Sequence, residues 1–492
     1  MRSRIRLKIP QKMNFDKVNP FGLLALFICL GLSIAHCEQV LPDKEVVLND
    51  KVDRLVRDKM YHEVIPGLAL AVVKDGKIIN AQAYGFADVD AKIPVTTNTV
   101  FRIGSISKQF IATAIMMLVE EGKLNPDDPV SKYLDGPPRR WKKITIRNLL
   151  THTSGIPDFL NENIPVDANP DAFDQSMFKA VARRGLHFAP GEEWSYSNSN
   201  YHLLGIIIRK ITGKPYGDFL RERIFQPLGM TQTAVSPIVG NVPGLAVGYE
   251  FYTNNNRLLP SDSKAPSIKA DAAGGIVSTI ADLAKWDATL YTTNLLKKSS
   301  LQQMWTPVRL NDGMTWEYGF GWDVGRLNDH LIVSHGGNLS GFSSEIYRAV
   351  DDRLTVIILD NRISSSTAEL AQKIAKLHVW KGPDYRPIPD IEPKITARVQ
   401  DIVDRGDRGR LREKDFTPAV WAELSPQRKE IQDEGRKIGP ALSLTLVEHT
   451  VDTDKRSYRY WIQYKFGKIL LHVVIDGQNK ITVWKVEDVD LK

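Results

Sequence analysis

Hydrophobic positions between residues 67 and 84 predict a pair of antiparallel strands. Residues 67–73 form an apolar, β-prone run, and residues 77–84 form a second one. Asp75-Gly76 lies between them and is a strong signal for a tight hairpin turn. The two runs therefore predict a β-hairpin.

The hydrophobic spacing changes to that of a helix at residue 105. From there to residue 118 the apolar residues fall three or four positions apart, and Gly122 is a suitable helix end. The chain up to about residue 310 then mixes helical patterns with Gly-, Pro- and Asn-rich loops. Helices are predicted near residues 201–211 and 279–290, the second preceded by Thr279 and Asp282 in a pattern that resembles a capping box.

Strand patterns return in the later part of this region. The predicted strands cover residues 318–324, 330–334, 344–350 and 354–359, and an amphipathic helix follows over residues 367–379. The simplest arrangement pairs the early hairpin with these strands in one antiparallel sheet, interrupted by a helical insertion of about 200 residues. This predicts an α+β fold in which sheet and helical lobe form a cleft, a common place for a ligand site.

A proline-rich segment, residues 381–393, reads as a stiff linker. It separates a first domain, residues 45–380, from a small α+β domain, residues 394–492. The second domain is predicted to have a helix over residues 426–438 and strands at 442–448, 457–466, 468–475 and 480–486. Alternating aromatic residues in its second strand fit either an ordinary sheet face or a docking surface.

Residues 1–35 have the pattern of a signal peptide. Basic residues precede an apolar run over residues 21–32, and Ser33 and Ala35 suit cleavage after Ala35. The run is too short for a comfortable membrane span. We therefore expect an exported protein, periplasmic or secreted. Because the basic stretch is long, the alternatives are that Met13 is the true start or that the segment stays uncleaved as a membrane anchor.

Charge and cysteine content narrow the possible partners. Six Lys or Arg residues against one Asp in residues 1–35 supply +5 of the formal net charge of +7, which leaves about +2 for the rest. Nucleic acid is therefore not an expected partner. Cys29 and Cys37 both lie at or beside the signal segment, so no internal disulfide is expected in the mature chain. The bulky His36 before Cys37 argues against a lipidation site.

The first candidate catalytic motif covers residues 101–108, which read FRIGSISK. Residues three apart share a helix face, so Lys108 would project beside Ser105 at the helix N-terminus. There the helix field and free N–H groups would stabilise an alkoxide and the oxyanion that follows its attack. A lysine near its reference pKa of about 10.4 accepts no proton at neutral pH, so Lys108 either has a depressed pKa or stays charged and tunes a partner. Alone, the pair is weak evidence, because Ser105 is also a good N-cap.

Two further motifs carry polar residues of the same kind of chemistry. In the segment 193–198, EWSYSN, Tyr196 is a candidate base or proton shuttle and Asn198 a candidate contact for a substrate carbonyl or the lysine. In the segment 335–338, HGGN, the paired Gly336 and Gly337 would let substrate lie against the backbone. The N–H of Asn338 is a candidate oxyanion donor, and His335 a proton-bearing or anion-binding group.

Together and in this order, the three motifs resemble those of the serine β-lactamase and penicillin-binding protein superfamily. The likeness is greatest to the branch of class C β-lactamases, D-alanyl-D-alanine carboxypeptidases and esterases, with its Tyr-x-Asn second motif and its frequent His-x-Gly third motif. The surrounding segments 99–105, 149–155, 196–201 and 227–230 also resemble that branch, and the likeness covers roughly residues 45–380.

The resemblance implies a five-stranded antiparallel sheet flanked by helices. It also implies roles for the residues: Ser105 as nucleophile, Lys108 as activating lysine, Tyr196 as proton acceptor and donor, and Asn198 as a substrate and lysine contact. His335 stands where other members have a lysine, which weakens the expectation of an efficient β-lactamase, because a histidine is charged only when protonated. His152, in the THTSG loop, is predicted to be structural.

The sequence thus predicts a serine hydrolase that forms an acyl-enzyme with a small peptide, β-lactam or ester substrate. The alternative is a non-catalytic sensor on the same fold that binds cell-wall fragments or β-lactams. No cofactor or metal is expected, because the chain has no zinc-type histidine pairing, no phosphate-binding loop and no dinucleotide fingerprint.

Overall fold

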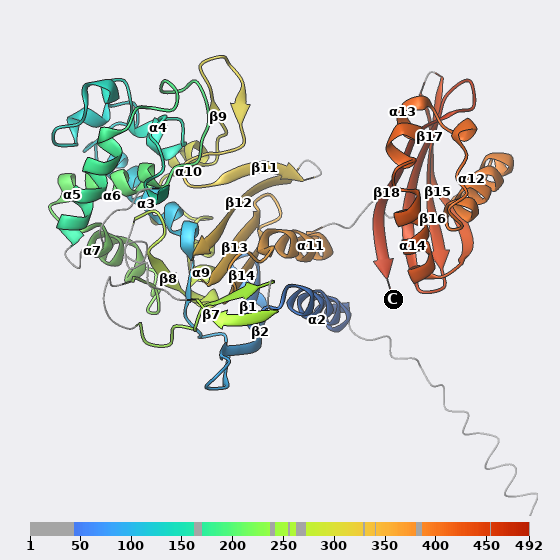
Figure 1. Ribbon diagram of the computed structural model, residues 1–492, viewed down its shortest axis with the longest axis horizontal. Helices are drawn as coiled ribbons and strands as arrows, with labels where there is room; N and C mark the ends of the chain where they lie inside the picture. Colours follow the sequence, from blue (N-terminus) through green and yellow to red (C-terminus); the bar gives the residue numbers. More distant parts are fainter. Residues whose placement is uncertain are drawn as a thin grey trace, which may run out of the picture. The chain divides into compact units, whose positions relative to one another are not determined.

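The computed structural model describes residues 44–161, 170–236, 242–253, 256–261, 272–327, 330–339, 341–379, 386–452 and 454–491. The chain divides into two compact units, Met1–Val379 and Trp380–Lys492, each described here by itself (Figure 1). The predicted signal peptide, residues 1–35, lies outside the described residues. Within the described ranges, no helix combines the length and apolar character needed to cross a bilayer.

An antiparallel sheet forms the centre of the first unit, in the strand order β11-β12-β13-β14-β1-β2-β3 (Figure 1). Its five longer strands are β1 (Gly67–Lys74), β2 (Lys77–Asp88), β12 (His330–Leu339), β13 (Phe342–Ala349) and β14 (Leu354–Asp360). The short strands β3 (Ile93–Pro94) and β11 (Asp323–Leu327) extend the two edges, so the sheet has seven strands instead of the five that the resemblance implied. The early hairpin pairs with the late strands, as predicted, through β1 and β14.

Strand β1 shows why the centre of this sheet is stable. Its residues Leu68, Leu70 and Val72 are buried on one face, and the alternate residues Ala69, Ala71 and Val73 are buried on the other. Side chains of a strand point alternately to the two faces, so an uninterrupted apolar run marks a strand covered on both sides. The sheet therefore lies between two layers.

Helices α2 (Lys44–Glu63) and α11 (Thr367–Val379) cover one face of the sheet. Helix α11 has the bounds that its hydrophobic spacing predicts. Helix α9 (Ile280–Thr289) packs on the other face, against β1 and β14. Its N-cap Thr279 accepts a hydrogen bond from the backbone N–H of Asp282, as the sequence pattern indicated.

The segment between β3 and β11 forms the helical lobe. Its 3₁₀ turn η1 (Gly104–Ile106) leads directly into the buried helix α3 (Ser107–Glu120). Among the described residues of this segment, the other helices of seven or more residues are α5 (Pro170–Arg183), α6 (Asn198–Thr212), α9 and α10 (Lys298–Met304). Shorter helices are α4 (Ile146–Leu150) and α7 (Tyr216–Leu220), with the single turns η2 (Val130–Lys132), η3 (Arg139–Trp141) and η4 (Phe159–Asn161) and the π-helical η5 (Arg221–Phe225).

Short strands complete the lobe. They are β4 (Phe101–Arg102), β5 (Ala234–Val235), β6 (Tyr249–Tyr252), β7 (Arg257–Pro260), β8 (Ile276–Ser278), β9 (Val308–Arg309) and β10 (Thr315–Trp316). Strand β8 pairs with β4, and only Ile103 separates β4 from η1. This pairing ties the segment before η1 to a strand late in the insertion.

Two strand predictions differ from the structure near the third motif. Strand β11 begins at Asp323, not at residue 318, because Gly321 adopts a φ of +75°, which breaks extended geometry. Strand β12 continues to Leu339, five residues beyond the predicted end, because β13 pairs with it along that whole length. The third motif therefore lies inside a strand and not after one.

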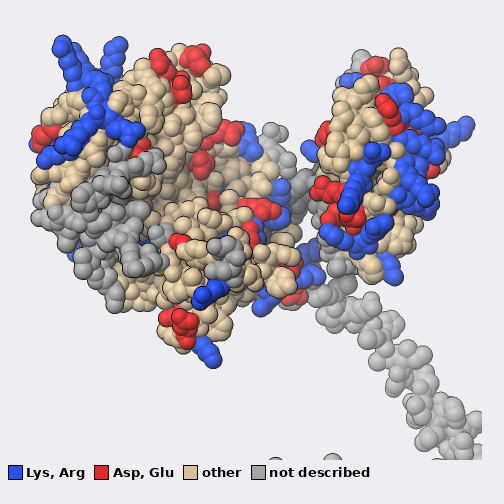
Figure 2. All heavy atoms as spheres, in the orientation of Figure 1, with Lys and Arg blue, Asp and Glu red and all other residues tan. Residues whose placement is uncertain are grey.

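The second unit has four antiparallel strands in sequence order, β15 (Ala441–Asp452), β16 (Lys455–Tyr464), β17 (Gly467–Ile475) and β18 (Ile481–Leu491). Its helices are α12 (Pro393–Gly406), α13 (Pro418–Leu424) and α14 (Arg428–Ile438), with a 3₁₀ turn η6 (Glu413–Asp415). The last proline of the predicted linker begins α12, a position where proline is favourable. Tyr458, Tyr460 and Tyr464 are buried in its core, which fits an ordinary sheet face. Lys and Arg side chains cover much of its visible surface (Figure 2).

Candidate active site

Ser105 lies in the turn η1, two residues before the first residue of α3, and not in the helix itself. Gly104 precedes it with a φ of +48°. A Cβ atom at Gly104 would lie 3.0 Å from the backbone nitrogen of Asn338, so a side chain there would be both strained and crowded. The glycine therefore lets the backbone of Ser105 approach strand β12.

Lys108 is fully buried on the first turn of α3, and its ammonium group reaches back to Ser105. The Nζ atom donates to Ser105 Oγ at 2.9 Å, to Asn198 Oδ1 at 2.9 Å and to the carbonyl of Ala273 at 2.7 Å. An ammonium group has three N–H donors, and these three oxygen atoms match them. The lysine is thus held in one orientation against the serine.

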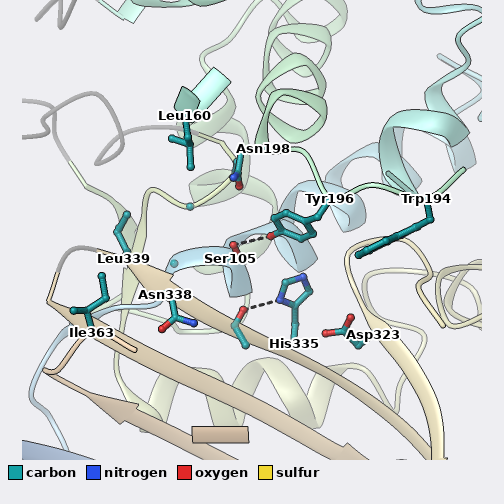
Figure 3. A pocket seen from close by; sticks show the side chains of 14 residues that line it. Ser105, Leu160, Trp194, Tyr196, Asn198, Asp323, His335, Asn338, Leu339 and Ile363 are labelled. Carbon is teal, nitrogen blue, oxygen red and sulfur yellow. Dashed lines mark hydrogen bonds between the residues drawn. The ribbon is translucent and has the colours of Figure 1, made fainter. Parts of the chain in front are cut away.

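Tyr196 and Asn198 approach Ser105 and Lys108 from the other side of the pocket. Tyr196, just before α6, donates its phenolic O–H to Ser105 Oγ at 2.8 Å (Figure 3). Asn198 is the first residue of α6, and its Nδ2 donates to Asp158 Oδ2 at 2.8 Å. A carboxylate accepts only, so Asp158 turns the amide nitrogen towards itself and the amide oxygen towards Lys108. The structure therefore brings Ser105, Lys108, Tyr196 and Asn198 together.

Strand β12 forms the opposite wall with the third motif. Strand β11 pairs with it only as far as Ser334, so from His335 onwards this edge of β12 is not covered by β11 and faces η1. A Cβ atom at Gly337 would lie 2.2 Å from the carbonyl oxygen of Ile103. Gly337 was expected to lie against substrate, but it packs against the segment before η1 and does not line the pocket. Gly336 and Asn338 do line it.

Both ring nitrogens of His335 are engaged within the protein. Its Nδ1 lies 2.7 Å from the carbonyl oxygen of Gly336, and its Nε2 lies 3.0 Å from the hydroxyl of Tyr318. A carbonyl oxygen only accepts, so Nδ1 carries the hydrogen, and in the neutral ring Nε2 accepts from Tyr318. Burial lowers the pKa of His335, with Lys108 acting in the same direction and Asp323 opposing it. The expected anion-binding role of His335 therefore lacks both the charge and a free N–H donor.

Sequence reasoning missed Tyr318, Asp323, Trp194 and Asp158. Tyr318 and Asp323 belong to the run YGFGWD over residues 318–323, which was read as one strand although its two glycines indicate an irregular segment. Asp158 lies three residues after the end of the THTSG loop, and its carboxylate accepts from the first backbone N–H of α6. Burial raises the pKa of Tyr318 well above its ordinary value, so it stays a neutral hydrogen-bond donor to His335.

His152 is fully buried beside the site, where its ring lies 4.3 Å from that of Tyr196. Its Nδ1 accepts from the backbone N–H of Ser197 at 3.2 Å and lies 3.1 Å from Asn200 Nδ2. Burial and the neighbouring Lys108 hold the pKa of His152 well below its usual range. It is a neutral residue that supports the Tyr196 segment, in keeping with the structural role predicted for it.

These residues surround a pocket of ≈ 660 Å³ between the helical lobe and β12 (Figure 3). Predicted site residues that line it are Ser105, Tyr196, Asn198, His335, Gly336 and Asn338. Further lining residues include Leu160, Trp194, Asp323, Leu339 and Ile363. A serine hydroxyl that contacts a lysine, a tyrosine and an open pocket is arranged for nucleophilic attack.

Comparisons with known proteins agree with this arrangement. The family model described as Beta-lactamase matches residues 52–378. Penicillin-binding protein 4* of Bacillus subtilis (strain 168) is 35% identical over 336 residues, which are 65% of this chain and 73% of that protein. The D-amino acid amidase of Ochrobactrum anthropi SV3, solved with L-phenylalanine amide, is 27% identical with a TM-score of 0.59 and covers 67% of this chain and 98% of its own.

A further solved structure extends the likeness in fold. It is the octameric penicillin-binding protein homologue from Pyrococcus abyssi, 23% identical with a TM-score of 0.59. The match covers 90% of this chain and 98% of that one. At this identity the likeness concerns the fold alone.

Proposed function

The chain belongs to the Beta-lactamase family and is a serine hydrolase of the β-lactamase and penicillin-binding protein type, and from this premise we propose that Ser105 is its nucleophile. The observation that carries the proposal is the contact of Ser105 Oγ with both Lys108 Nζ, at 2.9 Å, and Tyr196 OH, at 2.8 Å. A serine hydroxyl is a weak nucleophile until a neighbour accepts its proton. Two such neighbours stand within hydrogen-bond reach here.

In the proposed acylation step, Tyr196 acts as a phenolate that has lost its proton to solvent, and Ser105 Oγ attacks the substrate carbonyl while its proton passes to the phenolate oxygen. Once Tyr196 is deprotonated, the contact in which its O–H donates to Ser105 Oγ is reversed, and the Ser105 O–H donates to the phenolate. The ammonium of Lys108 stabilises the negative charge on Ser105 Oγ and on the phenolic oxygen of Tyr196 while the proton moves. Tyr196 then returns the proton to the leaving group as the bond to the carbonyl carbon breaks.

The oxyanion and the deacylation step complete the proposed cycle. The backbone N–H groups of Ser105 and Asn338 are the proposed oxyanion donors, and the close approach of Gly104 to Asn338 supports this pairing. Water then attacks the acyl-enzyme, gives its proton to Tyr196 and releases the acid, while Ser105 regains a proton. Asn198 is proposed to hold Lys108 in place and to contact the substrate.

Amides and lactams are the proposed substrate bonds, supported by the similarity to a D-amino acid amidase and to penicillin-binding proteins. Hydrolysis of esters, or of peptides by a carboxypeptidase activity, would use the same acyl-enzyme chemistry. A panel of D-phenylalanine amide, D-Ala-D-Ala peptides, nitrocefin and p-nitrophenyl acetate tests this directly. Ser105→Ala should lower kcat/KM by at least about 1,000-fold on every compound that the wild type hydrolyses.

Ser131→Ala is the matched control, because Ser131 is an exposed serine in η2. Its kinetics should equal those of the wild type. Turnover that survives in Ser105→Ala would refute the proposal. Binding of a labelled penicillin without any turnover would favour the sensor alternative instead.

We also propose that residues 1–35 direct export, with cleavage after Ala35. The support is the basic and apolar pattern of the segment alone. N-terminal sequencing of the protein from an expressing bacterial host should find a first residue of His36. Recovery of the intact segment in the membrane fraction would favour the uncleaved anchor.

A further inference from the structure

The catalytic pocket has two chemically different ends. In Figure 3, the apolar side chains of Leu160, Leu339 and Ile363 lie on one side of Ser105. On the other side lie Trp194, His335 and Asp323. A substrate that spans the pocket therefore places its two halves, joined at the scissile bond, in different surroundings.

The position of Tyr196 identifies the end that receives the leaving group, a step that rests on the proposed function. The group that returns the proton must contact the departing atom. Tyr196 lies on the same side of Ser105 as His335 and Asp323 (Figure 3). The leaving group is therefore released towards Asp323, and the acyl group occupies the end formed by Leu160, Leu339 and Ile363.

The leaving-group end of the pocket contains an acidic side chain. Of the described residues that line the pocket, Asp323 has the only carboxylate, and none is a lysine or arginine. His335 offers no positive charge, and both of its nitrogens are bonded within the protein. Lys108 is buried behind Ser105 and directs its ammonium to the nucleophile. The aromatic face of Trp194 also favours cations over anions.

We infer that Asp323 is a specificity residue that repels a free carboxylate on the leaving group and favours a neutral or positively charged one. Like charges a few ångströms apart in a partly desolvated site oppose each other strongly, whereas opposite charges attract. The substrate class is accordingly an amide or ester whose departing amine or alcohol carries an ammonium group or no charge. Peptides with a free carboxylate on the departing residue are disfavoured.

Three esters with the same acyl group and differently charged leaving groups test this inference without assuming the natural substrate. The probes are 4-acetoxybenzoate, 4-acetoxybenzamide and (4-acetoxyphenyl)trimethylammonium, whose leaving phenols carry a negative, zero and positive substituent. Each kcat/KM is divided by the rate of hydroxide hydrolysis of the same ester, which removes differences in leaving-group reactivity. Desolvation raises the pKa of Asp323, so the assays are run at pH 8.

For the full-length wild type, the corrected kcat/KM should rise from the anionic to the cationic ester by at least about tenfold, and this ratio should shrink in high salt. Asp323→Asn should bring the ratio within about threefold of one, and Asp323→Lys should invert it. Glu317→Gln is the matched control, because Glu317 is an exposed acid six residues away that does not line the pocket. It should keep the wild-type ratio.

The outcomes separate the two proposals. Hydrolysis that depends on Ser105 but is equally fast for all three esters, or fastest for the anion, overturns the role of Asp323 and leaves the nucleophile intact. The same holds if Asp323→Asn keeps the full wild-type ratio. If no ester is hydrolysed in a Ser105-dependent way, the proposed function fails with it. If the Asp323 variants fail to fold, a wild-type ratio near one, or a ratio that does not change with salt, still overturns the role of Asp323.

Discussion

Among the described residues of the first unit, the basic side chains of Lys108 and Arg348 are both fully buried, and they have very different surroundings. Lys108 directs its ammonium to three neutral oxygen atoms, one of which is the proposed nucleophile. Arg348, on β13, donates from Nε to Asp287 Oδ1 at 2.6 Å, and Thr355 bonds the same carboxylate oxygen. Its guanidinium also lies over the rings of Tyr291, Trp305 and Trp322.

The difference in contacts indicates that Arg348 contributes to stability and Lys108 to the proposed reaction. The charge of Arg348 is compensated by a carboxylate and an aromatic cage, so it joins the sheet to α9 and has no contact with the pocket. The charge of Lys108 is aimed at an oxygen that must become negative during the reaction. Burial alone therefore does not distinguish the two cations, but the identity of the atoms that they contact does.

Replacing Lys108 should have the largest effect. Lys108→Met keeps the length of the side chain but removes the ammonium, so kcat/KM should fall by about 1,000-fold or more. The unfolding free energy should fall by less than in Arg348→Met, because no buried carboxylate loses its partner. Steady-state kinetics and urea denaturation measure both quantities. Lys123→Met, at a half-exposed lysine after α3, should leave both unchanged.

Replacing Arg348 should have the opposite pair of effects, a large loss of unfolding free energy and a small change in kcat/KM. Arg348→Met leaves Asp287 charged and buried, which should cost about 3–5 kcal/mol of unfolding free energy. The kcat/KM of the folded fraction should stay within about threefold of the wild type, since no pocket atom is moved. Arg353→Met removes an exposed pair with Asp75 and should cost at most about 1 kcal/mol. Equal losses in the two variants would contradict this comparison.

A buried acid extends the comparison to negative charge. Burial raises the pKa of Asp360 to about 7, against hydrogen bonds from Ser365 Oγ and the N–H of Arg362. The folded state thus keeps a proton that the unfolded chain loses near pH 4, so this group lowers stability as the pH rises from about 4 to 7. Asp360→Asn should remove that decline of about 4 kcal/mol, measured as the difference between the two unfolding profiles. Parallel profiles would mean that Asp360 does not titrate in this range.

The smallest effect is expected at the N-cap of α9, the helix that carries Asp287. Thr279→Ala removes the acceptor for the N–H of Asp282 and should cost about 1 kcal/mol of unfolding free energy. Thr279→Ser keeps the oxygen and should restore most of it. Neither variant should change kcat/KM, because α9 does not line the pocket. A rate loss in Thr279→Ala would mean that α9 also positions the active site.

The elements predicted best from the sequence are those with a complete local signal. Helix α11 shows its whole amphipathic pattern within 13 residues, and the hairpin of β1 and β2 has a turn that only a few residue types form. The end of β12 was missed because the hydrogen bonds that extend it come from β13, and two glycines give no hydrophobic signal. Element boundaries of this kind depend on tertiary pairing.

The candidate site shows the same difference between features with a local sequence signal and features that depend on tertiary structure. Ser105 and Lys108 are three residues apart, so their contact could be predicted from local spacing, although Ser105 lies in η1 and Lys108 in α3. The contact of Tyr318 with His335, and the place of Asp323 in the pocket wall, depend on a break in the strand that Gly321 imposes. The sequence also left the role of His335 open between a proton-bearing and an anion-binding group, because it does not reveal what bonds each ring nitrogen.

Activation of Ser105 by Lys108 is the central feature of the proposed site. Its most direct test is the rate at which a neutral fluorophosphonate modifies the protein, with the modified residue identified by peptide mass spectrometry. The adduct should be on Ser105 in the wild type and should form at least about 100-fold more slowly in Lys108→Met. An adduct on another residue, or equal rates in the two proteins, would contradict the account.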